Sequence, residues 1–162
     1  MTADSVWSGL AATFVATFVR ESSWAYPLLE IAHMVGLGLL FGGILVFDLR
    51  LLGLARNISL AALSRHVLRL VFVGIAINIA SGLAMFASDA PEFAANASFK
   101  AKLVLIALAL LNAALYQFGP GRRADAFDRN EMPPPRVRLQ AALSIGLWFG
   151  VIAAGRLMAY VK

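Results

Sequence analysis

Cysteine is absent from this 162-residue sequence, and charged side chains are scarce. Without cysteine, the chain has no disulfide framework, thiolate zinc site, iron–sulfur cluster or c-type haem attachment motif. Charged residues make up 14% of the chain, whereas a soluble domain has about 25%. Hydrophobic residues make up 60%, and the mean hydropathy is +0.78. Since a soluble domain of this size could not bury so much apolar surface, and disordered chains are poor in hydrophobic residues, the composition predicts an integral membrane protein.

Long apolar runs predict four membrane-spanning helices, because about 20 mostly apolar residues cross the roughly 30 Å of hydrocarbon in a bilayer. The predicted spans cover residues 24–52, 60–87, 99–118 and 137–161. They use most of residues 1–162, so we expect one all-α domain, an integral membrane four-helix bundle. Residues 5–20 repeat apolar side chains at spacings of three and four, which predicts an N-terminal amphipathic helix lying in the membrane interface. Residues 119–136 carry three consecutive prolines and mixed charge, as is typical of a solvated loop.

The basic residues predict the orientation of the bundle. The formal charge is +5, and there are 14 lysines and arginines. Nine of them fall at the end of the bundle that holds the loop 119–136: Arg50, Arg56, Arg65, Arg69, Arg122, Arg123, Arg129, Arg136 and Arg138. The other five fall at the opposite end: Arg20, Lys100, Lys102, Arg156 and Lys162. Because cytoplasmic loops are enriched in basic residues, we expect the loop 119–136 to be cytoplasmic and both termini to lie outside the cytoplasm.

Nucleic acid is not an expected partner. The arginines alternate with apolar spans, and Asp125, Asp128 and Glu131 offset part of their charge. The expected surroundings of the chain are a lipid bilayer.

Two ionisable residues of the first span, Glu30 and His33, are three positions apart and therefore share a helix face. In the predicted orientation they lie toward the outer leaflet, at the depth of Lys102 and Arg156. Ionisable groups inside a membrane are costly and are candidates for function. The alternative is structural: Glu30 pairs with Arg156, and His33 only forms a hydrogen bond within the bundle.

The second histidine, His66, belongs near the opposite end of the bundle. At 1.5 Å per residue, the two imidazoles should differ in height by about 15–20 Å, so one iron cannot bind both. Met85 and Met158 fall near the depth of His33, and a His/Met set suits haem iron or Cu(I), although packing is the simpler explanation of a methionine. For His66 the simpler interpretation is an interfacial cluster in which Asp48 neutralises an arginine.

Small residues at spacings of four form stripes along three spans. Such stripes allow helix backbones to approach closely, or leave room for a flat porphyrin. The stripes are Gly38 and Gly42, then Gly74, Asn78 and Gly82, and finally Gly146, Gly150, Ala154 and Met158.

The motif WAYPLLEIAH at residues 24–33, followed by DLRLLG at residues 48–53, resembles a family of small four-span bacterial inner-membrane proteins of unknown function. FKAK at residues 99–102 also fits. The layout is more distantly similar to copper-resistance D-type membrane proteins and small b-type cytochromes, which hold haem or metal with histidines inside helical bundles. This sequence departs from the b-type cytochromes in lacking two histidines at one depth. The resemblance implies the bacterial inner membrane, and in that membrane the orientation predicted from the basic residues places both termini in the periplasm.

The first functional hypothesis is a redox or metal protein that binds haem b, or copper, at an outer-leaflet site. His33 would be the metal ligand, with Glu30 orienting it and with Arg156 and Lys102 pairing with the propionates. A further ligand would come from Met85, from Met158 or from a second copy of the chain, and His66 is a weaker cofactor candidate. A redox or periplasmic protein is an expected partner.

Two other hypotheses stay open, and none of the three assigns a catalytic residue. One is a small proton or ion transporter that uses Glu30 and His33 as protonatable stations and works as a homo-oligomer, since four spans are few for a transporter. The other is a non-catalytic membrane scaffold or assembly partner.

Overall fold

The computed structural model describes residues 3–121, 128 and 131–160. Within these ranges the chain is all α-helical, and no strand is present. Four helices are long and apolar enough to cross a membrane, which confirms the predicted multi-pass bundle. They are α3 (Ala25–Leu51), α4 (Leu60–Ser88), α6 (Ala97–Phe118) and α7 (Pro135–Leu157). Three short helices accompany them: α1 (Ala3–Ala11), α2 (Phe14–Glu21) and α5 (Ala90–Ala95).

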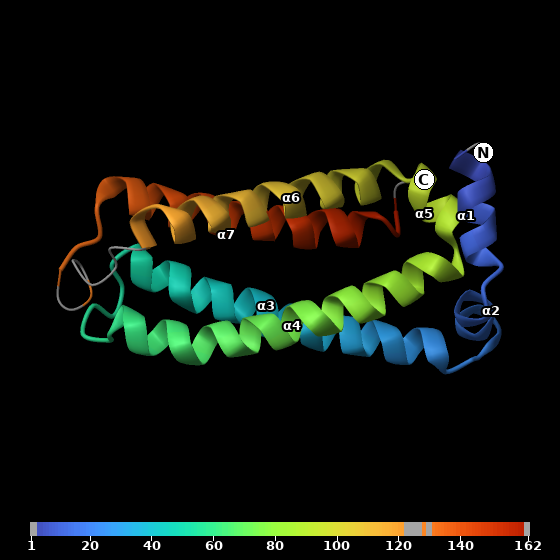
Figure 1. Ribbon diagram of the computed structural model, residues 1–162, viewed down its shortest axis with the longest axis horizontal. Helices are drawn as coiled ribbons and strands as arrows, with labels where there is room; N and C mark the ends of the chain where they lie inside the picture. Colours follow the sequence, from blue (N-terminus) through green and yellow to red (C-terminus); the bar gives the residue numbers. More distant parts are fainter. Residues whose placement is uncertain (1–2, 122–127, 129–130, 161–162) are drawn as a thin grey trace.

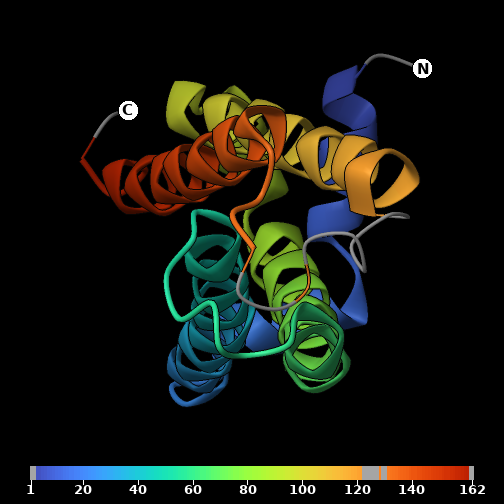
Figure 2. The same cartoon turned by 90° about the vertical axis from the view of Figure 1, so that its left-hand side faces the viewer.

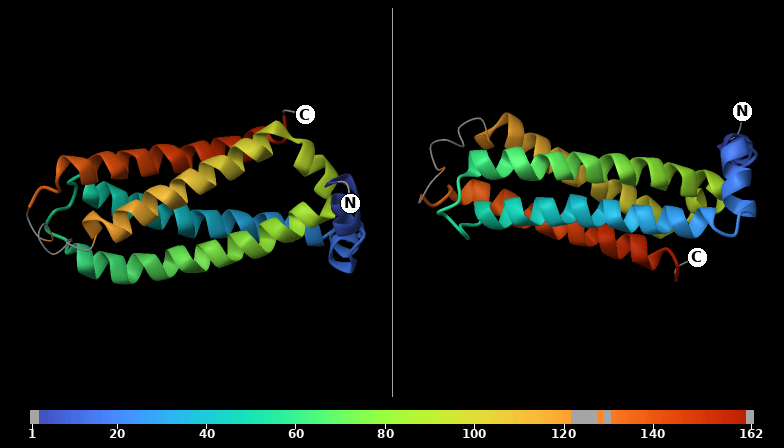
Figure 3. Two further views of the ribbon diagram at one scale, coloured as in Figure 1. Left: turned by 45° about the horizontal axis from the view of Figure 1, so that its top comes forward. Right: turned by 90° about the horizontal axis from the view of Figure 1, so that it is seen from below.

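The long helices form two antiparallel hairpins, α3 with α4 and α6 with α7, which lie against each other (Figure 1). Seen end-on, the pair α3 and α4 lies beside the pair α6 and α7 (Figure 2). The helices α1, α2 and α5 gather at one end, which also holds both ends of the chain (Figure 3); we call it the terminal end. The opposite end holds the turn at residues 52–59 and the connection from α6 to α7, and we call it the loop end.

Capping residues explain where the helices begin. Ser59 accepts a hydrogen bond from the backbone N–H of Ala62 at 3.2 Å and so starts α4. Asn96 does the same for α6 through Phe99, at 3.1 Å. The triple proline ends at Pro135, the first residue of α7, where a missing N–H costs nothing. The observed spans agree with the predicted ones to within a few residues.

The N-terminal segment differs from the prediction of one amphipathic helix over residues 5–20. It forms two helices, because Thr13 adopts an extended backbone and caps α2 through the N–H of Ala16 at 3.4 Å. The helix α2 is amphipathic as expected: Ala16 and Val19 are buried, and two phenylalanines, Phe14 and Phe18, face outward. The helix α1 is tied to the bundle by the Trp7 ring, whose edge meets the Phe86 ring of α4.

Glycines set the closest approach of α3 and α4. A Cβ atom at Gly74 would lie 2.6 Å from the carbonyl oxygen of Gly36, so the two backbones touch there. The stripe that begins at Gly74 therefore packs as predicted. Gly38 and Gly42 make no close approach to another helix, since a Cβ at either would meet nothing within 4 Å. The face of α3 that packs is the one that carries Gly36.

Two apolar clusters fill the bundle. The larger one lies in its middle and brings together Leu40, Val71, Ala109, Trp148 and Val151. A second cluster lies toward the loop end and contains Leu51, Leu60, Val137 and Ala141. Many other large apolar side chains face outward, Phe72 and Phe149 among them, as is expected where lipid is the solvent.

Candidate functional site

His33 lies on α3 near the terminal end, and its half-buried side chain rests against α4. Its Nδ1 atom is 2.9 Å from Oγ of Ser81, a residue that is only 3% exposed. The Cε1 atom of the ring is 3.3 Å from the position that a Cβ at Gly82 would take. The imidazole therefore forms a hydrogen bond with Ser81 and packs against α4 at Gly82.

The hydrogen bonds of Ser81 determine the tautomer of His33. The Oγ of Ser81 donates to the carbonyl oxygen of Ile77 at 2.6 Å, and a serine hydroxyl has one proton to donate. Since that proton is used, Oγ accepts in the contact with His33, and Nδ1–H donates. The neutral imidazole then carries a lone pair on Nε2. Nε2 is therefore the nitrogen that can bind a metal or accept a proton.

Lys102 of α6 reaches the same region from the other hairpin. Its side chain is half-buried, and its Nζ is 3.6 Å from the position of a Cβ at Gly155 of α7. It is also close enough to His33 for its charge to act on the imidazole. Lys102 therefore brings α6 close to His33 and itself packs against Gly155 of α7.

Glu30 and Arg156 are both exposed and are not joined. Arg156 instead donates from Nη2 to the Tyr160 hydroxyl at 2.9 Å, and its guanidinium lies 5.2 Å from the centre of that ring. Within the described residues no ion pair links Glu30 to Arg156, whereas His33 does form the hydrogen bond within the bundle that the structural alternative also predicted. The physical reason is local: Tyr160 follows Arg156 by four positions and is its nearer partner.

The two candidate methionines are half-buried. Met85 follows Ser81 by four residues, so it lies on the face of α4 that meets His33. Met158 caps the end of α7, and its carbonyl oxygen accepts a hydrogen bond from Asn96 Nδ2 at 3.4 Å. Met85 is thus the better placed of the two for a role beside His33.

His66 belongs to a different part of the bundle. It is exposed, and its Nδ1 lies 2.9 Å from the carbonyl oxygen of Ala62 in its own helix. Because Ser81 contacts His33 and is 15 residues from His66 along α4, the two histidines are about 22 Å apart in height at 1.5 Å per residue. The prediction that they cannot share one iron is confirmed.

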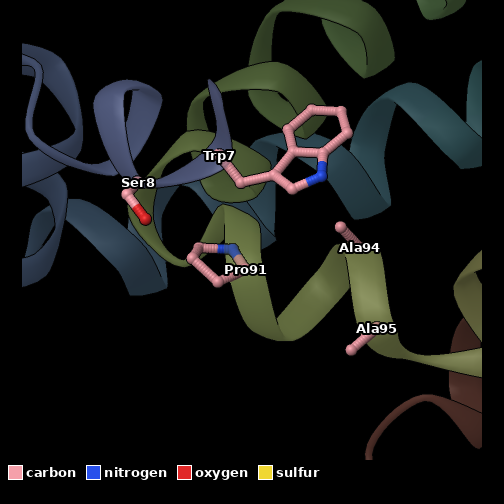
Figure 4. Close-up of a pocket in the computed structure, with 5 residues that line it drawn as sticks. All are labelled: Trp7, Ser8, Pro91, Ala94 and Ala95. Atoms are coloured by element: carbon pink, nitrogen blue, oxygen red, sulfur yellow. The ribbon is translucent and has the colours of Figure 1, made fainter. Parts of the chain in front are cut away.

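Two cavities lie away from His33. One of about 300 Å³ lies between α1 and α5, and Figure 4 shows its lining, which has no titratable side chain: Trp7, Ser8, Pro91, Ala94 and Ala95. The other, of about 210 Å³, is lined by apolar residues and Arg50 at the loop end of α3. Among the described residues, no group of three or more His, Asp or Glu side chains is placed to hold a metal ion.

Asp48, which the sequence placed in an interfacial cluster with an arginine, is buried in the bundle instead and is 5% exposed. Ser144 of α7 is the polar side chain that faces its carboxyl group, and Tyr116 of α6 is a further neighbour. Arg50 does not neutralise it, because residues two apart on a helix point about 200° apart. The sequence pattern did not predict that Ser144 would face Asp48 or that Ser81 would bind His33. The signal for both was a lone polar residue inside an apolar span.

Arg50 is 2% exposed and fastens the loop end. Its Nε donates to the carbonyl oxygen of Ile58 at 2.8 Å, and its Nη2 donates to the carbonyl oxygens of Arg56, at 3.3 Å, and Asp128. The Asp128 carboxylate in turn accepts from Ser59 Oγ at 2.9 Å and from the first N–H groups of α4. A carboxylate at this position also stabilises the positive end of the helix dipole. The connection from α6 to α7 is therefore tied to the turn between α3 and α4 at Asp128; the predicted loop residues Arg122, Arg123, Asp125 and Arg129 lie outside the described residues.

Comparison with known proteins gives one match. The family described as "Family of unknown function (DUF6644)" matches residues 11–161 of the chain. No curated protein and no solved structure matches the chain.

Proposed function

The chain belongs to this family of unknown function, and from the geometry around His33 we propose that it is a redox protein of the bacterial inner membrane that binds haem b. The observation that carries the proposal is the hydrogen bond from Nδ1 of His33 to Ser81, which leaves the Nε2 lone pair free. A metal-bound histidine almost always donates its other ring N–H to a fixed acceptor, which orients the ring and raises its basicity. His33 already has such an acceptor.

The donor set favours haem over a bare metal ion. A zinc site needs three or four protein ligands, and among the described residues no group of three or more His, Asp or Glu side chains is placed to hold a metal ion. A porphyrin supplies four nitrogens itself, so one imidazole is a sufficient protein ligand. Haem would supply one-electron chemistry at this site. Copper, held by His33 with Met85 and Met158, remains the alternative metal.

The other residues around His33 suit a cofactor with an apolar plane and two carboxylates. The half-buried Lys102 and the exposed Arg156 each offer a cation that can pair with a propionate. Glu30 is exposed and lies one helical turn before His33. Gly82 and Gly155 allow the imidazole and the lysine to pack directly against the helix backbone. Met85 or a second copy of the chain would provide a further ligand. In the orientation that the basic residues favour, the site lies toward the periplasm, where a redox protein could exchange electrons with it.

A second candidate function is proton or ion transport by a homo-oligomer through Glu30 and His33. The free Nε2 of His33 favours it, because that atom can also accept a proton. The apolar cluster around Leu40 and Trp148 separates this region from the loop end, which favours the redox function. A scaffold without a cofactor is the third possibility, and it predicts that replacing His33 changes neither spectrum nor activity.

The test is an absorption spectrum with metal analysis on protein purified from haem-replete and copper-replete cells. We expect a Soret band with about one haem per chain in the wild type, loss of that band in His33→Ala, and an unchanged band in the matched control His66→Ala. Circular dichroism checks that each variant is folded. Absence of the Soret band from the wild type, or its survival in folded His33→Ala protein, contradicts the proposal. Stoichiometric copper without haem would assign the site to the alternative metal.

A further inference from the structure

The loop end of the bundle contains a buried polar layer that the proposed redox function does not use. It is formed by one or two side chains from each of three spans. Asp48 of α3 and Ser144 of α7 are 5% and 8% exposed, and Asn112 of α6 is 7% exposed. Asn112 donates to the backbone carbonyl of Gln140 at 3.0 Å. The layer also includes Tyr116, whose ring packs edge-on against Phe47.

Within this layer, Asp48 has an oxygen atom without a partner. Its Oδ2 is buried and forms no hydrogen bond within the described part of the chain. Ser144 is the neighbour that faces the carboxyl group, and the apolar clusters around Trp148 and Val137 pack above and below it along α7. A hydrophobic residue would satisfy this position better than an aspartate if packing were its only role.

Among the described residues, the cations of the loop end are directed elsewhere, and Arg56, Arg136 and Arg138 are exposed. On its own helix, Arg50 donates from Nε and Nη2 to backbone carbonyls, and its Nη1 atom is buried without a partner in the described part of the chain. On α4, Arg65 and His66 are exposed and bind carbonyls of their own helix, and Arg69 is exposed. From α6 the titratable group is the Tyr116 phenol, and from α7 the Ser144 hydroxyl faces the carboxyl group. Gln140, one turn before Ser144, has a buried Oε1 atom without a partner among the described residues. None of these groups pairs with the carboxyl group as a counter-ion among the described residues.

An ionised carboxylate in these surroundings would be a buried charge without a counter-ion, which is among the costliest arrangements inside a bundle. A bound proton removes the charge and gives the carboxyl group a hydrogen-bond donor. We propose that Asp48, supported by Ser144 and Tyr116, is a proton-binding site. The proton comes from water at the loop end, which is one helical turn away because α3 ends at Leu51. One O–H bond forms on the carboxyl group, one breaks in hydronium, and no electron is exchanged.

This site is independent of haem binding, and its test is infrared spectroscopy of the purified protein in lipid nanodiscs during a pH titration. Exposed aspartates and glutamates are ionised at pH 7 because their pKa values lie near 4. We therefore expect a carboxylic acid carbonyl band at pH 7 in the wild type that grows when the pH is lowered and shrinks when it is raised. Asp48→Asn should lose this band, and the matched control Glu131→Gln, an exposed carboxylate at the same end, should retain it.

Several results would overturn the proposal. One is a wild-type spectrum without the band at pH 7, and another is a band that persists in folded Asp48→Asn protein. Loss of the band when sodium is added at constant pH would assign the site to a metal cation instead of a proton. If Asp48→Asn does not fold, Ser144→Ala decides: a shifted carbonyl band supports Asp48 as its source, and an unshifted band contradicts it.

Discussion

The two ends of the bundle use polar residues in opposite ways. At the terminal end, His33 and Lys102 are half-buried, and His33 is held by a single hydrogen bond to Ser81. At the loop end, Asp48 and Arg50 are almost completely buried, and Arg50 binds three backbone carbonyls. One end keeps a nitrogen lone pair available, and the other uses its cation to fasten the connections between spans.

The difference shows that burial alone does not identify a site for a ligand. Arg50 is the most buried of the described charged side chains at the two ends, yet its contacts explain it as a fastening residue. His33 is less buried, yet its hydrogen bond leaves one nitrogen free. The two roles are distinguished by which polar atoms already donate or accept a hydrogen bond and which atom remains available.

The largest expected effect comes from removing the fastening residue at the loop end. Arg50→Ala leaves three backbone carbonyls without their donor, and each unsatisfied group costs about 1–3 kcal/mol. We expect the free energy of unfolding, measured by SDS titration in mixed micelles, to fall by about 3 kcal/mol or more. The control Arg65→Ala removes an exposed arginine of the same end and should change stability by less than about 0.5 kcal/mol. Equal effects of the two substitutions would show that the buried contacts of Arg50 do not hold the loop end.

A smaller loss of stability is expected at the backbone contact between Gly36 of α3 and Gly74 of α4. Gly74→Ala places a Cβ atom 2.6 Å from the carbonyl oxygen of Gly36 and 2.7 Å from the N atom of Leu40, both of which are backbone. The helices must separate, at a cost of about 1–3 kcal/mol in the same SDS titration. Gly38→Ala meets nothing within 4 Å, and its better helix propensity makes it neutral or slightly stabilising. If Gly38→Ala lowers the free energy of unfolding, or Gly74→Ala does not, then α4 does not pack against the face of α3 that carries Gly36.

The spans were predictable from sequence because hydropathy and helix caps act locally. The structure places Ser59 and Asn96 as N-caps at the starts of α4 and α6, and the triple proline at the start of α7. The division of residues 5–20 was missed because Thr13 lies inside a regular apolar repeat, although threonine is a favoured N-cap.

The site was predictable only in part, because it depends on which helices are neighbours. The face shared by Glu30 and His33 followed from their spacing, but the contact with Ser81 joins residues 48 positions apart. Asp48 was misplaced for the same reason: hydropathy gave its depth, while its direction toward Ser144 depends on the packing of α7 against α3. Spans with apolar side chains on every face give little signal about their orientation.

The most direct test of the account is nitrogen NMR of the protein with ¹⁵N-labelled histidine, prepared without cofactor at a pH where His33 is neutral. The chemical shifts of the two ring nitrogens distinguish the tautomers, and His33→Ala assigns the signals. We predict that His33 carries its proton on Nδ1 and that Nε2 is unprotonated, because Ser81 donates its only proton to Ile77. In Ser81→Ala protein this preference should be lost. A proton on Nε2 in the wild type would contradict the account, because the nitrogen assigned to the ligand would then not be free.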